Sequence, residues 1–336
     1  MKLGILDQMP KPKGMTAEQT AAHTIELAQL AESLGYGRYW FAEHHATRGM
    51  ISSAPEVMMA AVASQTQTIK VGSGGILMPQ YSPFKVASQI AQLESLFPGR
   101  VEAGLGRSPG GAEFLRSLLA DDKPNQMAEY PDKLRQLIAY LDGSAKVHAA
   151  PRTTNRPELY SLGLGENSAL LAGLLGIGYV FGHFIQPDRG VAALQTYRET
   201  FSQGFMDTPS AKACVFVVCG EDDAHAEQLA HTQDIWLLNV EKGLDSQVPT
   251  PEAAEEKMRL LSEDEVKKVK NNRRRMIIGG PETVKVALDH LSDSYQCEDW
   301  LILCNIYDWE EKKQSFERLA ALYLGDESYS LHPNKI

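Results

Sequence analysis

The 336-residue sequence has few cysteines, no excess of positive charge and no long apolar run. Its four cysteines form no C-x-x-C pair and lie in or beside apolar stretches, which favours buried, reduced thiols. The formal net charge of −10 argues against nucleic acid or an anionic membrane as a partner. No apolar run is long enough to cross a bilayer, and Met1–Asp7 lacks the apolar core of a signal peptide. We therefore expect a cytoplasmic protein.

Short apolar segments alternate with longer amphipathic ones, and no internal repeat interrupts this pattern. Helix-start signals recur, such as the capping-box spacing of Thr16 with Gln19 and the prolines Pro55, Pro83 and Pro281 at first helical turns. Eight segments read as strands: Lys2–Leu6, Arg38–Ala42, Ile69–Leu77, Arg100–Leu105, Glu158–Leu162, Tyr179–Gly182, Lys212–Val218 and Trp300–Asn305. Nearly all are followed by a helix, which predicts an α/β fold, a (β/α)8 TIM barrel, as one domain over residues 1–336. A doubly wound open sheet is the alternative.

Two segments are too long to be simple loops. Arg107–Pro157 follows the fourth strand and Asn239–Arg275 follows the seventh. Insertions after the strands of a barrel usually shape its active site. The basic run Lys267–Arg275 stands beside acidic residues, so we interpret it as part of a solvated insertion rather than a nucleic-acid tract. A minor alternative is that one of its arginines folds over a bound phosphate.

The second predicted strand ends abruptly in three ionisable residues, Glu43, His44 and His45. The carboxyl ends of barrel strands open onto the active site, and histidine exchanges protons near neutral pH, so these residues are catalytic candidates. A zinc site is disfavoured because neighbouring residues on a strand point to opposite faces. The alternative is a histidine pair with a structural role only, hydrogen-bonded in the core.

Glycines cluster at three further places. In Val71–Leu77 they interrupt a strand, which marks either a bulge needed for barrel closure or the close approach of a flat ligand ring. Gly104–Gly110 and Gly163–Ser168 each follow a strand, and the first contains Arg107. Neither completes G-x-G-x-x-G, so a dinucleotide site is disfavoured. Two glycine turns with one arginine better suit a mononucleotide phosphate at a helix N-terminus.

Together these segments resemble the luciferase-like monooxygenase family, and the likeness extends over most of the chain. The matching pieces are Glu43-His44-His45, Ser53–Val57, Val71–Gly75, Pro79–Pro83, Leu96–Glu102 and Gly104–Gly110. The resemblance implies a barrel that binds FMN at the carboxyl ends of its strands. Light-emitting members have a reactive cysteine where this chain has Gly106, so bioluminescence is not carried over.

The resemblance also implies roles for particular residues. His44 would be a base or hydrogen-bond partner in flavin–oxygen chemistry, with His45 as its neighbour. Gly74 and Gly75 match a position where members often have a non-prolyl cis peptide beside the flavin ring. Arg107 would hold the flavin phosphate. Two further residues, Gly165 and Ser168, would assist it, although Gly165-Glu166-Asn167-Ser168 departs from the usual pair of serines. Glu43 and His183 are candidate substrate contacts, and no metal is expected.

The predicted function is therefore a monooxygenase that uses reduced FMN (FMNH2) and O2 on a small organic substrate. It would be the oxygenase half of a two-component system, with a separate flavin reductase supplying FMNH2, and a homodimer is expected from the resemblance. One alternative is a deazaflavin- or FMN-dependent dehydrogenase or reductase. A second is a flavin-binding protein without turnover, which the ionisable cluster at residues 43–45 argues against.

Overall fold

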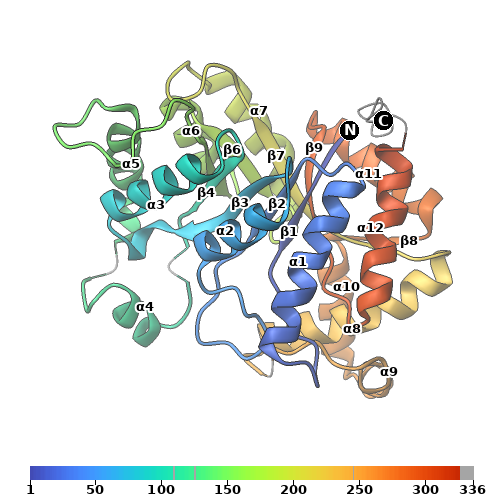
Figure 1. Cartoon of the computed structure of the whole chain (residues 1–336). Coiled ribbons are helices and arrows are strands. Elements are labelled where there is room, and N and C mark those ends of the chain that lie inside the picture. The colour runs from blue at the N-terminus through green and yellow to red at the C-terminus, as the bar shows by residue number, and fades with distance from the viewer. Residues whose placement is uncertain (109, 125, 245, 326–336) are drawn as a thin grey trace, which may run out of the picture. The chain divides into compact units, whose positions relative to one another are not determined.

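The structure is a computed structural model that describes residues 1–108, 110–124, 126–244 and 246–325 (Figure 1). Pro109, which belongs to the predicted turn Gly104–Gly110 and to the first insertion, lies outside the described residues. Within that part of the chain, no helix is long and apolar enough to span a membrane.

Nine strands form the sheet of the described chain: β1 Lys2–Asp7, β2 Arg38–Phe41, β3 Lys70–Leu77, β4 Val101–Gly106, β5 Glu158–Gly163, β6 Gly178–Gly182, β7 Ala211–Cys219, β8 Met276–Gly279 and β9 Asp299–Leu303. Hydrogen bonds link them in the order β6-β5-β4-β3-β2-β1-β9-β7-β8, and β6 also pairs with β7. Eight strands therefore close into a ring, and β8 pairs beside β7. This connectivity confirms the predicted (β/α)8 barrel. All eight predicted strands are present, and the ninth, β8, was missed.

Helices follow the strands as the alternating pattern predicted. The α-helices of the described residues are α1 Ala17–Ser33, α2 Pro55–Gln65, α3 Pro83–Leu96, α4 Glu113–Leu119, α5 Tyr130–Asp142, α6 Glu166–Leu175, α7 Gly190–Thr200, α8 Asp223–Glu241, α9 Pro251–Arg259, α10 Glu263–Arg273, α11 Pro281–Tyr295 and α12 Trp309–Tyr323. Three short 3₁₀ turns are η1 Met78–Gln80, η2 Met127–Glu129 and η3 Pro187–Arg189. The insertion after β4 contains α4 and α5, and that after β7 contains α9 and α10, with β8 directly following it.

The start signals read from the sequence explain where these helices begin. Thr16 caps α1 through the expected capping box, in which its hydroxyl accepts from the Gln19 N–H and the Gln19 side chain accepts from the Thr16 N–H. Prolines occupy the first turn of α2, α3 and α11, where a missing N–H leaves no hydrogen bond unmade.

The chain divides into two compact units. The terminal unit comprises Met1–Tyr39, Thr47–Ile51 and Cys214–Ile336, and the central unit comprises Trp40–Ala46 and Ser52–Ala213. The single domain expected from the sequence therefore remains a prediction. Every candidate site residue named from the sequence falls in the central unit, so the site can be described from that unit alone.

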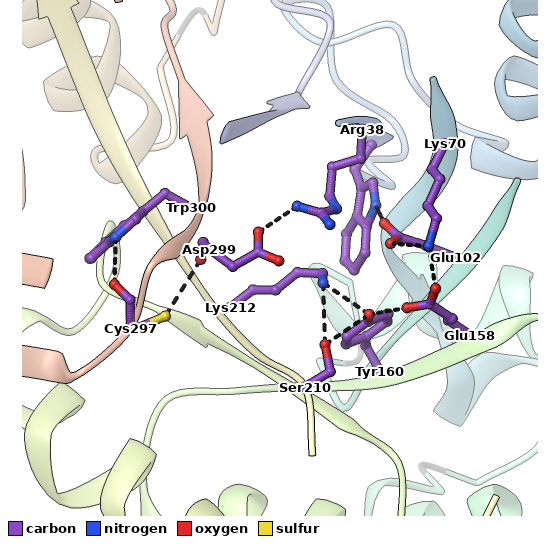
Figure 2. A network of polar contacts seen from close by, with 11 residues as sticks. Arg38, Lys70, Glu102, Glu158, Tyr160, Ser210, Lys212, Cys297, Asp299 and Trp300 are labelled. Carbon is purple, nitrogen blue, oxygen red and sulfur yellow. Dashed lines mark hydrogen bonds and ion pairs between the residues drawn. The ribbon is translucent and has the colours of Figure 1, made fainter. Parts of the chain in front are cut away.

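A buried polar network in the central unit lies toward the amino ends of its strands (Figure 2). The Lys212 ammonium donates to the Tyr160 hydroxyl (2.9 Å), which donates to Glu158, and Glu158 pairs with Lys70. Glu102 lies 3.6 Å from Lys70 and accepts from the Trp40 indole N–H (2.6 Å). Two ammonium groups thus balance two carboxylates. Residues at the amino ends of barrel strands usually contribute to stability rather than to catalysis. We therefore assign this network no catalytic role.

In the terminal unit, arginines of the basic run form ion pairs. Arg273 donates to Asp234 (2.6 Å) and to both carboxylate oxygens of Glu227 (2.7 and 2.8 Å), and Arg275 pairs with Glu241. The acidic partners belong to α8, so these cations attach the inserted segment to that helix. All four cysteines are buried and none forms a disulfide bond, as the sequence predicted.

Candidate functional site

The ionisable candidate residues follow three strands of the central unit, β2, β4 and β6. Glu43, His44 and His45 come after β2, Arg107 directly follows β4, and His183 directly follows β6. β3, β4, β5 and β6 pair in parallel register, with Gly74 opposite Gly104 and Gly163 opposite Phe181. The carboxyl ends of parallel strands meet at one edge of a sheet. The fold thus gathers the predicted residues at a single edge.

His44 has a buried ring nitrogen without a hydrogen bond. Its backbone N–H donates to the Ser52 carbonyl (2.8 Å), which holds the chain after β2 in place. The Nε2 atom is buried and meets no partner among the described residues. Burial lowers the pKa of His44 to about 4, with a smaller contribution from His45. The imidazole is therefore neutral at neutral pH and can accept a proton.

Glu43 contacts His45, and both of its carboxylate oxygens accept hydrogen bonds. Oε1 is 2.7 Å from His45 Nε2 and accepts from the Tyr81 hydroxyl, and Oε2 accepts from the Leu77 N–H (2.9 Å). Burial raises the pKa of Glu43, and these three hydrogen bonds act in the opposite direction. The carboxylate binds protein groups from the end of β3 and from the turn that follows it.

The predicted glycine step in β3 is distorted. The peptide between Gly74 and Gly75 is cis, and the register against β4 shifts between Gly74 and Ile76. A Cβ at Gly75 would come within 2.7 Å of the Gly104 carbonyl oxygen. The neighbouring glycines serve packing, because a Cβ at Gly72 or at Gly104 would strike the Trp40 ring. The bulge predicted from the sequence is therefore present, whereas the close approach of a flat ligand ring stays a prediction.

The proposed phosphate end of the site has two arginines. Arg107 is exposed after β4, and Arg189 lies beside the start of α6, where a Cβ on Gly165 would be 3.8 Å from its Nη1. Neither arginine has an acidic partner within the described residues. The Ser168 hydroxyl, by contrast, donates to the Gly165 carbonyl (2.7 Å) and lies 3.2 Å from the Tyr179 hydroxyl. The N-terminus of α6 has no side-chain cap, so its first N–H groups are available to an anion, whereas Ser168 is engaged within the protein.

His183 is the last of the predicted residues and is only 7% exposed. Burial lowers its pKa to about 4, and the charge of Asp188 opposes that shift in part. This edge of the sheet thus carries two histidines, His44 and His183, that are neutral at physiological pH. Among the described residues, no group of three histidine, cysteine, aspartate or glutamate side chains could hold a metal ion.

Sequence reasoning missed three residues at this edge: Tyr81, Lys133 and Arg189. Tyr81 stood inside the quoted segment Pro79–Pro83 but was not assigned a role. Lys133 lies in the first insertion, which contains no recognisable sequence motif. Arg189 ends the 3₁₀ turn η3, seven residues after β6 and one before α7, so no strand end marked it in the sequence. Their partners lie far away in sequence, so no local pattern identifies the contacts.

Comparisons with known proteins identify the family of the chain. The family model described as luciferase-like monooxygenase matches residues 1–295. The chain is 49% identical over 330 residues to the uncharacterized protein YceB of Bacillus subtilis (strain 168), covering 96% of this chain and 99% of that protein. It is 30% identical over 331 residues to N-acetyl-S-alkylcysteine monooxygenase of the same organism, covering 95% and 97%.

Solved structures show the same fold. The crystal structure of apo-MsnO8 has a TM-score of 0.89 at 33% identity and covers 99% of both chains. The oxygenating constituent of 3,6-diketocamphane monooxygenase from Pseudomonas putida, in complex with FMN, has a TM-score of 0.70 at 19% identity, covering 97% and 98%. An F420-dependent secondary alcohol dehydrogenase has a TM-score of 0.64 at 14% identity, covering 94% and 97%. With most of its length matched by the family model, the chain belongs to the luciferase-like monooxygenase family, a family of oxidoreductases.

Proposed function

We propose that this protein binds reduced FMN at the carboxyl ends of β2 to β6 and uses it with O2 to oxygenate a small organic substrate. The observation that carries the proposal is the buried, unpartnered Nε2 of His44. A buried polar atom without a partner is uncommon in folded proteins, and such atoms are found at catalytic sites. At this position an incoming ligand would supply the missing partner.

The neighbouring residues fit a flavin mononucleotide. Two arginines without acidic partners in the described chain, Arg107 and Arg189, and the N-terminus of α6 offer charge and N–H donors to one phosphate. The backbone at Gly74–Gly75 has no side chains to keep a flat ring away. When bound, reduced FMN supplies the electrons that activate O2.

The chain's own residues then have distinct tasks. His44 stays neutral because burial lowers its pKa to about 4, so it can accept and return a proton at a ring nitrogen. His45 lies beside it in the chain, and we assign a contact with the substrate to His183, which is also neutral. Arg107 and Arg189 orient the flavin from its phosphate end, with Gly165 allowing close approach. Ser168 supports that end by holding the Gly165 carbonyl.

The comparisons support the oxygenase proposal and suggest where to look for a substrate. The 30% identical relative is named for oxygenation of N-acetyl-S-alkylcysteines, so S-alkyl thioethers head the substrate panel. The similar structure with FMN is the oxygenating constituent of its system, which favours a separate flavin reductase as the partner here. A cytoplasmic homodimer completes the proposal.

The phosphate contacts provide the first test. Arg107→Ala and Arg189→Ala should each weaken FMN binding by about 10- to 100-fold, the effect of losing a charge-assisted hydrogen bond, and leave riboflavin binding unchanged. Fluorescence titration of both flavins measures this. Equal losses for FMN and riboflavin would show that the arginines act on the fold rather than on the phosphate.

Oxygen consumption separates the proposed activity from its alternatives. With FMNH2 and a substrate of the panel, the protein should consume O2 and produce an oxygenated product. Hydride transfer to a deazaflavin without O2 uptake would favour a dehydrogenase, such as the F420-dependent enzyme of similar fold. Flavin binding with neither reaction would favour a non-catalytic flavin carrier.

A further inference from the structure

The carboxylate of Glu43 collects three donors from separate segments of the central unit. They are the Leu77 N–H at 2.9 Å, the Tyr81 hydroxyl and His45 Nε2 at 2.7 Å, and the Glu43 side chain is 2% exposed. An ionised carboxylate is an acceptor only, so it satisfies all three donors. A protonated carboxyl would bring a proton of its own into a space already full of donors.

Two of these three bonds connect the ends of two neighbouring strands. Leu77 is the last residue of β3, two positions after the cis peptide between Gly74 and Gly75. Tyr81 follows the 3₁₀ turn Met78–Gln80. Glu43, which follows β2, therefore holds the end of β3 and the next turn from one point.

Lys133 also holds that turn. It is a buried residue of α5, and its ammonium donates to the backbone carbonyls of Met78 (3.2 Å), Pro79 (2.9 Å) and Tyr81 (2.9 Å). An ammonium group has three donors, and all three are used. Nothing remains on Lys133 for a ligand, so its contribution is to place Tyr81, whose hydroxyl reaches Glu43.

The ring of His45 is the group that this arrangement controls. A neutral imidazole has one donor nitrogen and one acceptor nitrogen, and the hydrogen bond made by one determines the state of the other. A carboxylate at Nε2 favours the proton there and leaves Nδ1 as the acceptor. An oriented base with a third group behind it is a recurring arrangement in enzyme sites.

We propose that Glu43, Tyr81 and Lys133 are positioning residues that hold His45 with its proton on Nε2 and fix the Gly74–Gly75 segment against the flavin. The role of His45 beside a flavin rests on the proposed function, whereas its tautomer is a property of the protein alone. The sequence suggested Glu43 as a substrate contact. With both of its oxygens bound to protein donors, a supporting role accounts better for its position.

The tautomer can be measured without flavin. Long-range ¹H–¹⁵N NMR of ¹⁵N-histidine-labelled protein distinguishes the two neutral forms, and His45→Gln identifies the His45 signals among the nine histidines. We expect the Nε2–H form in the wild type and a loss of that preference in Glu43→Gln. The Leu77 backbone N–H can only donate, so the amide oxygen stays on it and the NH2 group faces His45 Nε2, which can accept only with its proton on Nδ1. A wild type without the Nε2–H form, or an unchanged Glu43→Gln spectrum, overturns the proposal.

A second measurement uses bound flavin and does not depend on the folding of a Glu43 variant. Tyr81→Phe removes only one hydroxyl, and Lys133→Met keeps an unbranched side chain. Each should change the rate at which bound FMNH2 is reoxidised by O2 at least five-fold, with FMN affinity within three-fold of the wild type. Tyr140→Phe is the matched control, because the Tyr140 ring packs on Phe84 and its hydroxyl makes no hydrogen bond to a described residue.

The two measurements distinguish the two possible failures. Variants that behave like Tyr140→Phe overturn the positioning role even if the wild type binds and oxidises FMNH2 normally. A wild type that binds no FMN or FMNH2 overturns the proposed function, while the NMR result still decides whether Glu43 fixes the His45 tautomer.

Discussion

Lowering the pH from 7 to 5 should destabilise the folded protein through its two buried histidines, His44 and His183. Burial lowers the pKa of each to about 4, against 6.5 in the unfolded chain. At pH 5 an unfolded histidine is about 97% protonated, whereas a folded one with a pKa of about 4 is about 9% protonated. Protons then bind the unfolded state preferentially, so the stabilisation is complete above pH 6.5 and is lost as the pH falls toward 4.

The size of the loss follows from this difference in protonation. Each histidine should cost ~2 kcal/mol of unfolding free energy between pH 7 and pH 5, and the pair ~4 kcal/mol if they titrate independently. Carboxylates elsewhere also contribute to the pH dependence, so the comparison must be made between variants. His44→Asn and His183→Asn each remove one titrating ring, and each should lower the loss by ~2 kcal/mol.

Urea unfolding followed by circular dichroism at pH 7 and pH 5 provides the assay. The variant His290→Asn, at an exposed position of α11, is the control and should keep the full wild-type loss. If His44→Asn loses as much stability as the wild type, the His44 ring is accessible to water in the folded protein. The argument that it is a neutral, buried base would then be refuted.

Three further predictions concern the same edge of the sheet. Gly104→Ala should destabilise the protein by ~3 kcal/mol or more in urea unfolding, because the new Cβ would be 2.0 Å from the Ser73 carbonyl oxygen and 2.8 Å from the Trp40 ring. Gly106→Ala should cost ~1 kcal/mol or less, since its Cβ would be 3.4 Å from the Ile76 carbonyl oxygen; equal costs for the two glycines would contradict the packing account. His44→Asn should bind FMN like the wild type and lose about 10²- to 10⁴-fold in substrate oxygenation, and unchanged turnover would remove His44 from the chemistry.

The fold was predictable because its signals are local. Alternation of short apolar runs with capped amphipathic helices identified β1 to β7 and β9 to within one or two residues at their ends. β8 escaped because it has only four residues and lies between the basic run and the start of α11 at Pro281. Its identity as a strand depends on pairing with β7, and pairing between distant segments leaves no periodic pattern in a four-residue segment.

The site was predictable to the extent that its residues follow strands directly. Glu43, His44, Arg107 and His183 were found because polar residues after a buried strand are visible in the sequence. Lys133 could not be found this way, because it binds carbonyls at positions 78, 79 and 81, more than fifty residues earlier. The contacts of such a residue depend on how α5 packs, which only the structure supplies.

Side-chain hydrogen bonds changed two expectations, one for Ser168 and one for the basic run. Ser168 follows the predicted glycine turn, yet its hydroxyl is committed to the Gly165 carbonyl, and Arg189 is the added cation beside that turn. The basic run at 267–275 was interpreted as a solvated insertion. Arg273 and Arg275 from that run instead pair with acidic residues of α8, which were not considered as partners.

The most direct test of a flavin-dependent oxygenase is anaerobic titration of the purified protein with FMNH2, followed by rapid mixing with oxygenated buffer. The account predicts that FMNH2 binds more tightly than FMN, and that oxidised FMN reappears more slowly than it does from free FMNH2. It also predicts that Arg107→Ala weakens the binding. The absence of FMNH2 binding, or reoxidation at the rate of the free flavin, would contradict it.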